Sequence, residues 1–159
     1  KQEQPKAPVK TPEERLDYRR PCEISSEIAE IFARIETAVC LAYQITNAEI
    51  SSGESAHYVS RARALAADLL RGKCSIQQRA YVWRVAPSTV VYAQRLPTLD
   101  ARLFAANKTL AINYLAQITA ALDANEPTQE QQEIALRVKK RAEEIAQTVS
   151  KARQSLEAN

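Results

Sequence analysis

The chain has 159 residues, a formal net charge of +3 and a hydrophobic content of 45%, which suit one globular domain with a real core. Only two glycines occur, which excludes a glycine-rich phosphate loop and argues against a sheet protein with many tight turns. No run of about 18 apolar residues is present, so no transmembrane helix is predicted. Alanine, leucine, glutamate, glutamine and arginine are strong helix formers and dominate the composition, which therefore predicts an all-α fold.

The first 21 residues differ in composition from the rest of the chain. The block KQEQPKAPVK has three lysines and two prolines and can bury little apolar area, so we expect residues 1–21 to form an extended, flexible spacer. The sequence begins without Met, which fits either a processed precursor or a trimmed chain. Such a spacer is typical of a periplasmic protein or an envelope lipoprotein. The terminus of a cytoplasmic protein is the alternative.

Residues 22–157 are predicted to form a single helical-bundle domain. The first long helix is expected to begin near Ser25 or Ser26, both good N-caps, and to pack on two sides as the central helix. Its apolar stripe consists of Ile28, Phe32, Ile35, Val39, Ala42 and Thr46. A second helix is predicted over residues 56–71, with Gly72 as a left-handed C-terminal cap.

The connection after this pair of helices is the most irregular part of the sequence. Ser75 and Gln78 have the spacing of a capping box, which predicts a short helix, although the β-rich string AYVWRV also fits a strand. A second short helix is predicted over residues 88–95, because a proline stands on each side of it.

Two long helices follow, over about 98–123 and 129–156. Thr128 and Gln131 form another capping-box spacing at the start of the last helix, which has a heptad-like apolar stripe. The sequence therefore predicts a bundle of four main helices, with one or two short helices in the middle connection.

The three cysteines indicate a redox compartment rather than a metal site. None lies in a CxxC pair, and the single His of the chain cannot complete a usual zinc set, so no metal is predicted. If the first two long helices form a hairpin, Cys40 lies about 13 Å along the axis from Cys74, which exceeds the ~7 Å that a disulfide allows. We therefore predict a Cys22–Cys74 disulfide in an oxidising compartment. Three reduced thiols are the alternative.

The charge distribution is uneven and gives the one functional signal. Residues 61–108 carry nine Lys or Arg against two Asp or Glu, whereas residues 1–60 carry seven against ten and residues 109–159 six against seven. Aromatic side chains lie in the same basic segment, and together the two types are typical of a recognition surface. The predicted partner-binding residues are Arg71, Lys73, Arg79, Tyr81, Trp83, Arg84, Tyr92 and Arg95. Alternatively, the aromatic rings pack in the core and the cations are scattered.

Nothing in the sequence points to catalysis or to a cofactor. His57 has no obvious acidic partner and is expected to be a surface or helix-start residue. Carboxylates such as Glu133 stand at helical spacing from a cation, here Arg137, as in ordinary surface pairs. The chain is therefore predicted not to be an enzyme, and no cofactor or catalytic residue is assigned.

The function predicted from these features is that of an extracytoplasmic helical protein in the bacterial envelope. It is expected to dock a protein partner with an acidic or polar surface in an envelope assembly, tethered by its flexible N-terminus. An anionic envelope component also fits the basic segment. Nucleic acid fits less well, because no helix has a dense row of cations. The alternatives are an intracellular binding module, for nucleic acid or as a protein scaffold, and a bundle with a ligand cavity.

Overall fold

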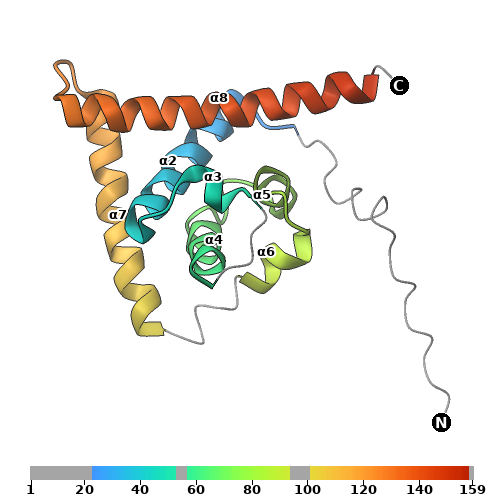
Figure 1. Cartoon of the computed structure of the whole chain (residues 1–159), viewed down its shortest axis with the longest axis horizontal. Coiled ribbons are helices and arrows are strands. Elements are labelled where there is room, and N and C mark those ends of the chain that lie inside the picture. The colour runs from blue at the N-terminus through green and yellow to red at the C-terminus, as the bar shows by residue number, and fades with distance from the viewer. Residues whose placement is uncertain (1–22, 53–56, 94–100, 158–159) are drawn as a thin grey trace, which may run out of the picture.

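The computed structural model describes residues 23–52, 57–93 and 101–157, and these contain helices and turns but no strand (Figure 1). The all-α prediction is confirmed. The helices are α2 (Ser26–Tyr43), α3 (Asn47–Ile50), α4 (His57–Leu69), α5 (Ile76–Trp83), α6 (Pro87–Ala93), α7 (Ala101–Asp123) and α8 (Gln129–Glu157). The predicted spacer, residues 1–21, lies outside the described residues.

Three predicted helix starts are confirmed by side-chain caps. The Ser25 hydroxyl accepts a hydrogen bond of 3.1 Å from the backbone N–H three residues later. Ser75 and Gln78 form both bonds of a capping box at the start of α5, so the string AYVWRV belongs mostly to a helix and the strand alternative is wrong. Thr128 and Gln131 exchange the equivalent bonds at 3.0 and 3.2 Å before α8.

The first helix ends earlier than its apolar stripe predicts. Gln44 takes a left-handed conformation with φ of 56°, and its N–H bonds back to the last turn of α2. Thr46, which the stripe placed inside the first helix, instead caps α3 through a capping box with Glu49. A polar cap residue competes with helix continuation because its side chain satisfies the N–H groups of a new first turn. The resulting corner carries α3 across the end of α2.

The central position of α2 is confirmed. This helix packs against α4, α7 and α8, while α4 and α5 also contact α6. One hydrophobic cluster joins these helices, and its large buried side chains include Phe32, Leu65, Trp83, Ile118 and Ile145. None of the helices in the described ranges is both long enough and apolar enough to cross a membrane.

The predicted bundle of four main helices is not confirmed. The four longest helices are α2, α4, α7 and α8, but Figure 1 shows α7 running across α8 instead of alongside it. Parallel helices look parallel from every direction, so these two do not belong to one aligned bundle. The short helices α5 and α6 lie beside α4, at the side of the molecule opposite α7 (Figure 1).

Candidate functional site: a two-arginine pocket beside a buried carboxylate

Three of the eight predicted partner-binding residues are buried. Arg79, Tyr81 and Trp83 are only 3%, 8% and 1% exposed. The indole ring of Trp83 packs against the ring of Phe32 with the centroids 5.3 Å apart, so it contributes to the core between α2 and α5. Arg79 and Trp83 therefore offer almost no surface to a partner, and Tyr81 offers only the part of its side chain that lines a small pocket. Tyr81 and Trp83 follow the alternative interpretation, in which the aromatic rings pack in the core.

The remaining predicted residues do not complete a single surface. Arg71 and Lys73 are exposed in the turn before α5, and Arg84 is exposed at the other end of the same helix. A helix of this length holds its two ends more than about 10 Å apart. The Tyr92 side chain and Arg95 lie outside the described residues. Of the predicted set, Tyr81 and Arg84 become part of a pocket.

Several other cations of the basic segment are used within the fold. Arg63 is buried and donates from Nε to the Ile50 carbonyl at 2.7 Å, next to the end of α3. Lys108 on α7 pairs with Asp68 on α4 at 3.0 Å. The large positive charge of residues 61–108 is therefore not presented on one face.

Arg79 joins α5 to the end of α4. It donates from Nη1 to the Ala67 carbonyl at 2.8 Å and from Nε to the Ser75 carbonyl at 3.4 Å. Ala67 lies in the last turn of α4, where carbonyl groups lack intrahelical partners and carry the negative end of the helix dipole. Burial lowers the pKa of Arg79. We call Arg79 with the Ala67 and Ser75 carbonyls the α4–α5 joint.

A fully buried carboxylate occupies the other junction of the fold. Glu36 on α2 is 0% exposed, and each of its oxygens accepts two hydrogen bonds. Oε1 accepts from Asn47 Nδ2 at 2.8 Å and from Arg141 Nε at 2.7 Å. Oε2 accepts from Trp83 Nε1 and from Arg141 Nη2, both at 3.1 Å. Four donors satisfy the whole capacity of a carboxylate, which is what burial of this charge requires.

Arg137 extends this network to the corner between α2 and α3. It donates from Nε to Asn47 Oδ1 at 2.8 Å and from Nη2 to the Ile45 carbonyl at 3.1 Å. The expected surface pair with Glu133 is therefore not the role of Arg137, because its guanidinium turns inward. We call Glu36, Asn47, Trp83, Arg137 and Arg141 the Glu36 cluster. It fastens α8 to α2, α3 and α5.

Arg141 is the charged partner of Glu36 and is held in place by it. Burial opposes the charge on Arg141, but the carboxylates of Glu36 and, to a smaller extent, Glu144 together outweigh burial and raise the pKa of the guanidinium. The bidentate contact fixes the plane of the guanidinium. Its remaining nitrogen, Nη1, is 3.5 Å from a carboxylate oxygen of Glu144, a long contact that leaves this group able to donate elsewhere.

The cysteines are free thiols in the described part of the chain. Cys74 carries no disulfide, so the predicted Cys22–Cys74 bond is not supported, and Cys22 itself lies outside the described residues. Burial raises the pKa of Cys74 to about 11, against a smaller opposite effect of Arg79. Burial also raises the pKa of Cys40, and Glu36 adds to this increase. Neither thiol is suited to act as a nucleophile near neutral pH.

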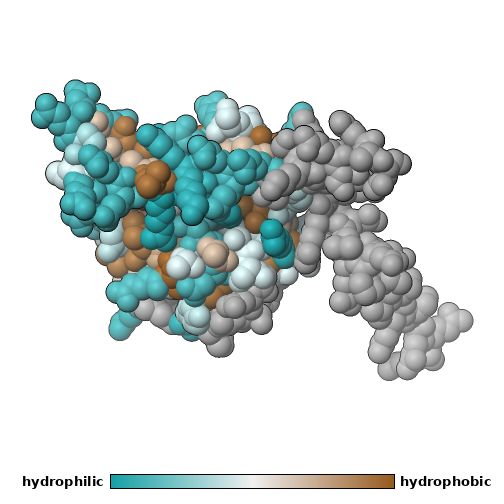
Figure 2. All heavy atoms as spheres, turned by 45° about the horizontal axis from the view of Figure 1, so that its top comes forward, coloured by the Kyte–Doolittle hydropathy of each residue, from teal (hydrophilic) through white to brown (hydrophobic). Residues whose placement is uncertain are grey.

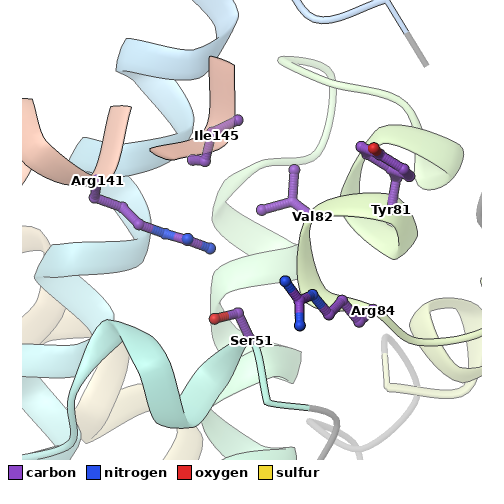
Figure 3. A pocket seen from close by; sticks show the side chains of 6 residues that line it. All are labelled: Ser51, Tyr81, Val82, Arg84, Arg141 and Ile145. Carbon is purple, nitrogen blue, oxygen red and sulfur yellow. The ribbon is translucent and has the colours of Figure 1, made fainter. Parts of the chain in front are cut away.

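A small polar pocket lies next to the Glu36 cluster, between α3, α5 and α8. Its volume is about 40 Å³, and it is lined by Ser51, Tyr81, Val82, Arg84, Arg141 and Ile145. Figure 3 shows the guanidinium groups of Arg84 and Arg141 and the Ser51 hydroxyl directed toward the same space. Val82 and Ile145 supply an apolar wall on one side of that space (Figure 3). The arrangement places two cations opposite each other around a small volume.

The charge in this pocket is only partly neutralised. Glu36 is already matched by Arg141, and within the described residues no carboxylate forms an ion pair with Arg84. A water molecule needs roughly 10–15 Å³, whereas typical metabolite pockets measure about 300–1,000 Å³. The pocket thus has room for one carboxylate group or a few waters, and not for a metabolite. An arginine fork binds a carboxylate through two parallel hydrogen bonds.

Sequence reasoning missed Glu36, Asn47 and Arg141. One signal was present in α2, where Glu36 interrupts the run of apolar and small residues on the buried side of the helix. Another was present in α8, where Arg137 and Arg141 stand four residues apart and border the apolar stripe. The pairing of these residues depends on contacts across about 100 positions of the chain, which spacing alone does not reveal.

Comparison with known proteins supplies no role for these residues. No protein-family model, no curated protein and no solved structure matches this chain. Within residues 23–52, 57–93 and 101–157, no group of three or more His, Cys, Asp or Glu side chains is placed to hold a metal ion.

Proposed function

We propose that this chain is a non-enzymatic helical binding protein that docks a protein partner, with an acidic side chain of the partner entering the pocket between Arg84 and Arg141. The observation that carries the proposal is the exposed Arg84 guanidinium, which forms no ion pair with a carboxylate of the described residues and faces a second, firmly held guanidinium. A carboxylate placed there would accept from Arg84 and from Arg141 Nη1, next to the Ser51 hydroxyl, which donates to the Asn47 carbonyl at 2.9 Å.

The size of the pocket favours a protein as the source of this carboxylate. A single acidic group gains little affinity on its own, because exposed ion pairs contribute only about 0–1 kcal/mol. An acidic side chain on a folded partner adds the contact area around the pocket and is oriented before it binds. The pocket then selects the partner by charge, and the rigid Glu36 cluster keeps Arg141 in the receiving position.

The setting that we propose is the extracytoplasmic face of a bacterial envelope, with residues 1–21 supplying reach. The composition of that segment supports a spacer, as described above. The free thiol of Cys74 does not support an oxidising compartment and favours the second candidate, an intracellular binding module. Thiol counting on unreduced protein from its natural source separates the two. Three free thiols would contradict the envelope setting, and a disulfide would contradict the intracellular one.

Binding is tested by titrating isotope-labelled full-length protein with a hexaglutamate peptide and following the NMR spectrum. We expect the largest shifts at Ser51, Arg84 and Arg141, and we expect added salt to weaken the binding. Hexaglutamine has the same length without the charges and serves as the control. Equal shifts with hexaglutamine, or shifts confined to another part of the molecule, would contradict the proposed site.

The same titration with a single-stranded DNA oligonucleotide addresses the nucleic-acid alternative. If binding is governed by phosphate contacts, the affinity for DNA will exceed that for hexaglutamate and fall steeply with salt. We expect weak binding at most, because Arg63 and Lys108 are engaged within the fold and the exposed cations do not share one face.

A further inference from the structure

One side of α7 has no described partner. The helix packs against α2, α4 and α8, and Figure 1 shows it at the edge of the molecule, with no described element beyond it. The exposed residues between positions 105 and 120 lie on this side, and we call them the α7 outer face. Leu110 and Ile112 belong to it and are 40% and 47% exposed, although both are large apolar residues.

The α7 outer face contains no charged residue. Lys108, the one charged residue between positions 105 and 120, is half-buried and pairs with Asp68 of α4. The hydroxyls of Thr109 and Thr119 each donate to the carbonyl four residues earlier at 3.0 Å. These hydroxyls are thereby satisfied within the helix. Most other exposed positions are alanine, which lets a second helix approach closely.

Two side-chain amides supply the polar groups of the face. Asn113 stands near its middle, and Gln117 follows one turn later. A side-chain amide both donates and accepts hydrogen bonds, so it can pair with an identical amide. A single Asn among apolar positions also fixes the register between two helices.

We propose that the α7 outer face pairs with the same face of a second copy of this chain. In a symmetric dimer the patch of one copy meets the same patch of the other, so an excess of one sign of charge on the patch would cause repulsion, which an uncharged face avoids. The α7 outer face meets this condition. The outer face of α8 is charged instead, since Lys139, Lys140 and Glu143 are exposed on this helix. Figure 2, which turns this side of the molecule forward, shows a largely hydrophilic surface.

The N-terminal segment of the same chain is a poorer occupant for this face. Residues 1–22 contain ten charged side chains. Covering α7 with them would remove charges from water without offering any opposite charge. A second α7 brings no such charges.

The size of the face implies a weak dimer. Residues 105–120 span about 24 Å of helix, and a helix with its side chains is about 10–12 Å wide. Pairing two such strips buries less than the roughly 1,200 Å² of a stable complex, so association should depend on concentration. This proposal does not rest on the proposed function, because the pocket is formed by α3, α5 and α8.

Analytical ultracentrifugation of the full chain, from about 10 µM to about 1 mM, tests the proposal. We expect a reversible monomer–dimer equilibrium, with the dissociation constant raised at least about tenfold by Ala116→Glu, which adds an unpaired negative charge to the paired face of each copy. The matched control is Ala146→Glu, the same change at an exposed position of α8, which should leave the equilibrium unchanged.

Circular dichroism confirms that both variants are folded before they are compared. A monomer at every concentration would overturn the proposal. So would a folded Ala116→Glu variant that dimerises as the parent does, since the dimer would then use another face. Binding of the parent chain to phosphatidylcholine vesicles that Ala116→Glu abolishes, without self-association, would assign the face to lipid instead.

Discussion

Arg141 and Arg79 are both buried arginines that join helices, but their charges are balanced in different ways. Arg141 faces the carboxylate of Glu36, which raises its pKa in spite of burial. Arg79 bonds to backbone carbonyls at the α4–α5 joint, and burial lowers its pKa. The first contact is an ion pair with full hydrogen bonding, whereas the second relies on the dipoles at the end of a helix.

The Glu36 cluster therefore depends more strongly on its arginine than the α4–α5 joint does. Glu36 has no access to water, so removal of Arg141 leaves a buried charge without a counter-charge. Removal of Arg79 leaves neutral carbonyls, whose loss of hydrogen bonds costs less than an uncompensated charge. The Glu36 cluster is therefore the more vulnerable junction, and it is also the one that borders the pocket.

The largest effect is expected for Arg141→Ala. The variant should lose about 3–5 kcal/mol of unfolding free energy, because Glu36 is left buried and unpaired. Chemical denaturation measures this loss. The double variant Glu36→Leu, Arg141→Met removes both charges and should recover much of the stability. A cost below about 1 kcal/mol for Arg141→Ala would show that the ion pair does not hold this junction.

A smaller loss is expected for Arg79→Met at the α4–α5 joint. The change keeps much of the apolar volume and removes the bonds to the Ala67 and Ser75 carbonyls, at a cost of about 1.5–3 kcal/mol. The same denaturation experiment checks it. If Arg79→Met proves as destabilising as Arg141→Ala, the claim that the Glu36 cluster is the more vulnerable junction is contradicted.

A free cysteine lies near each junction, Cys74 at the α4–α5 joint and Cys40 at the Glu36 cluster, and its rate of alkylation measures how well the junction is closed. The pKa of Cys74 is raised from 9.0 to about 11, so the folded state favours its thiol form. The contribution of this pKa shift to the free energy of unfolding is fully present below about pH 9 and is lost as the pH rises toward 11. At about pH 8, alkylation of Cys74 should be up to ~100-fold slower in the folded than in the unfolded chain.

Cys40 should react more slowly still, since it is fully buried and lies close to the Glu36 cluster. Arg141→Ala should accelerate its alkylation far more than Arg79→Met does, because only the first change opens the surrounding cluster. Peptide mapping by mass spectrometry resolves the two cysteines. Equal acceleration of Cys40 by both variants would contradict the separation of the junctions.

The helix caps show what the sequence can predict here. Ser25, the Ser75–Gln78 pair and the Thr128–Gln131 pair act over three residues of chain, so spacing alone identifies them. The early end of α2 was missed, because the apolar stripe continues through a corner that Thr46 creates.

The candidate site could not be predicted in the same way. Trp83 and Arg79 look like surface recognition residues in sequence, and only the packing of α5 against α2 and α4 shows that they are buried. Glu36 and Arg141 are separated by 105 positions, and their pairing follows from the placement of α8 across α2. Arg84 and Tyr81 belong to the predicted set, but the other residues that line the pocket were not predicted.

The smallest effect on stability is expected at two left-handed residues, Arg84 and Gln44, both with φ of 56°. Glycine adopts this conformation without the steric cost that other residues have, but it loses more backbone entropy on folding. Arg84→Gly and Gln44→Gly should each change stability by less than about 1 kcal/mol and in the same direction. Thermal denaturation measures both. A large loss in either variant would show that the side chain supports the fold.

This matched pair gives the most direct test of the proposed binding site. Both variants change a left-handed helix cap, but only Arg84→Gly removes a guanidinium. Hexaglutamate titrations of the two folded variants therefore separate these two effects. We predict that Arg84→Gly loses most of the chemical-shift response at Ser51 and Arg141, whereas Gln44→Gly responds as the parent chain does. An undiminished response in Arg84→Gly would contradict the assignment of the pocket as the acidic-side-chain site.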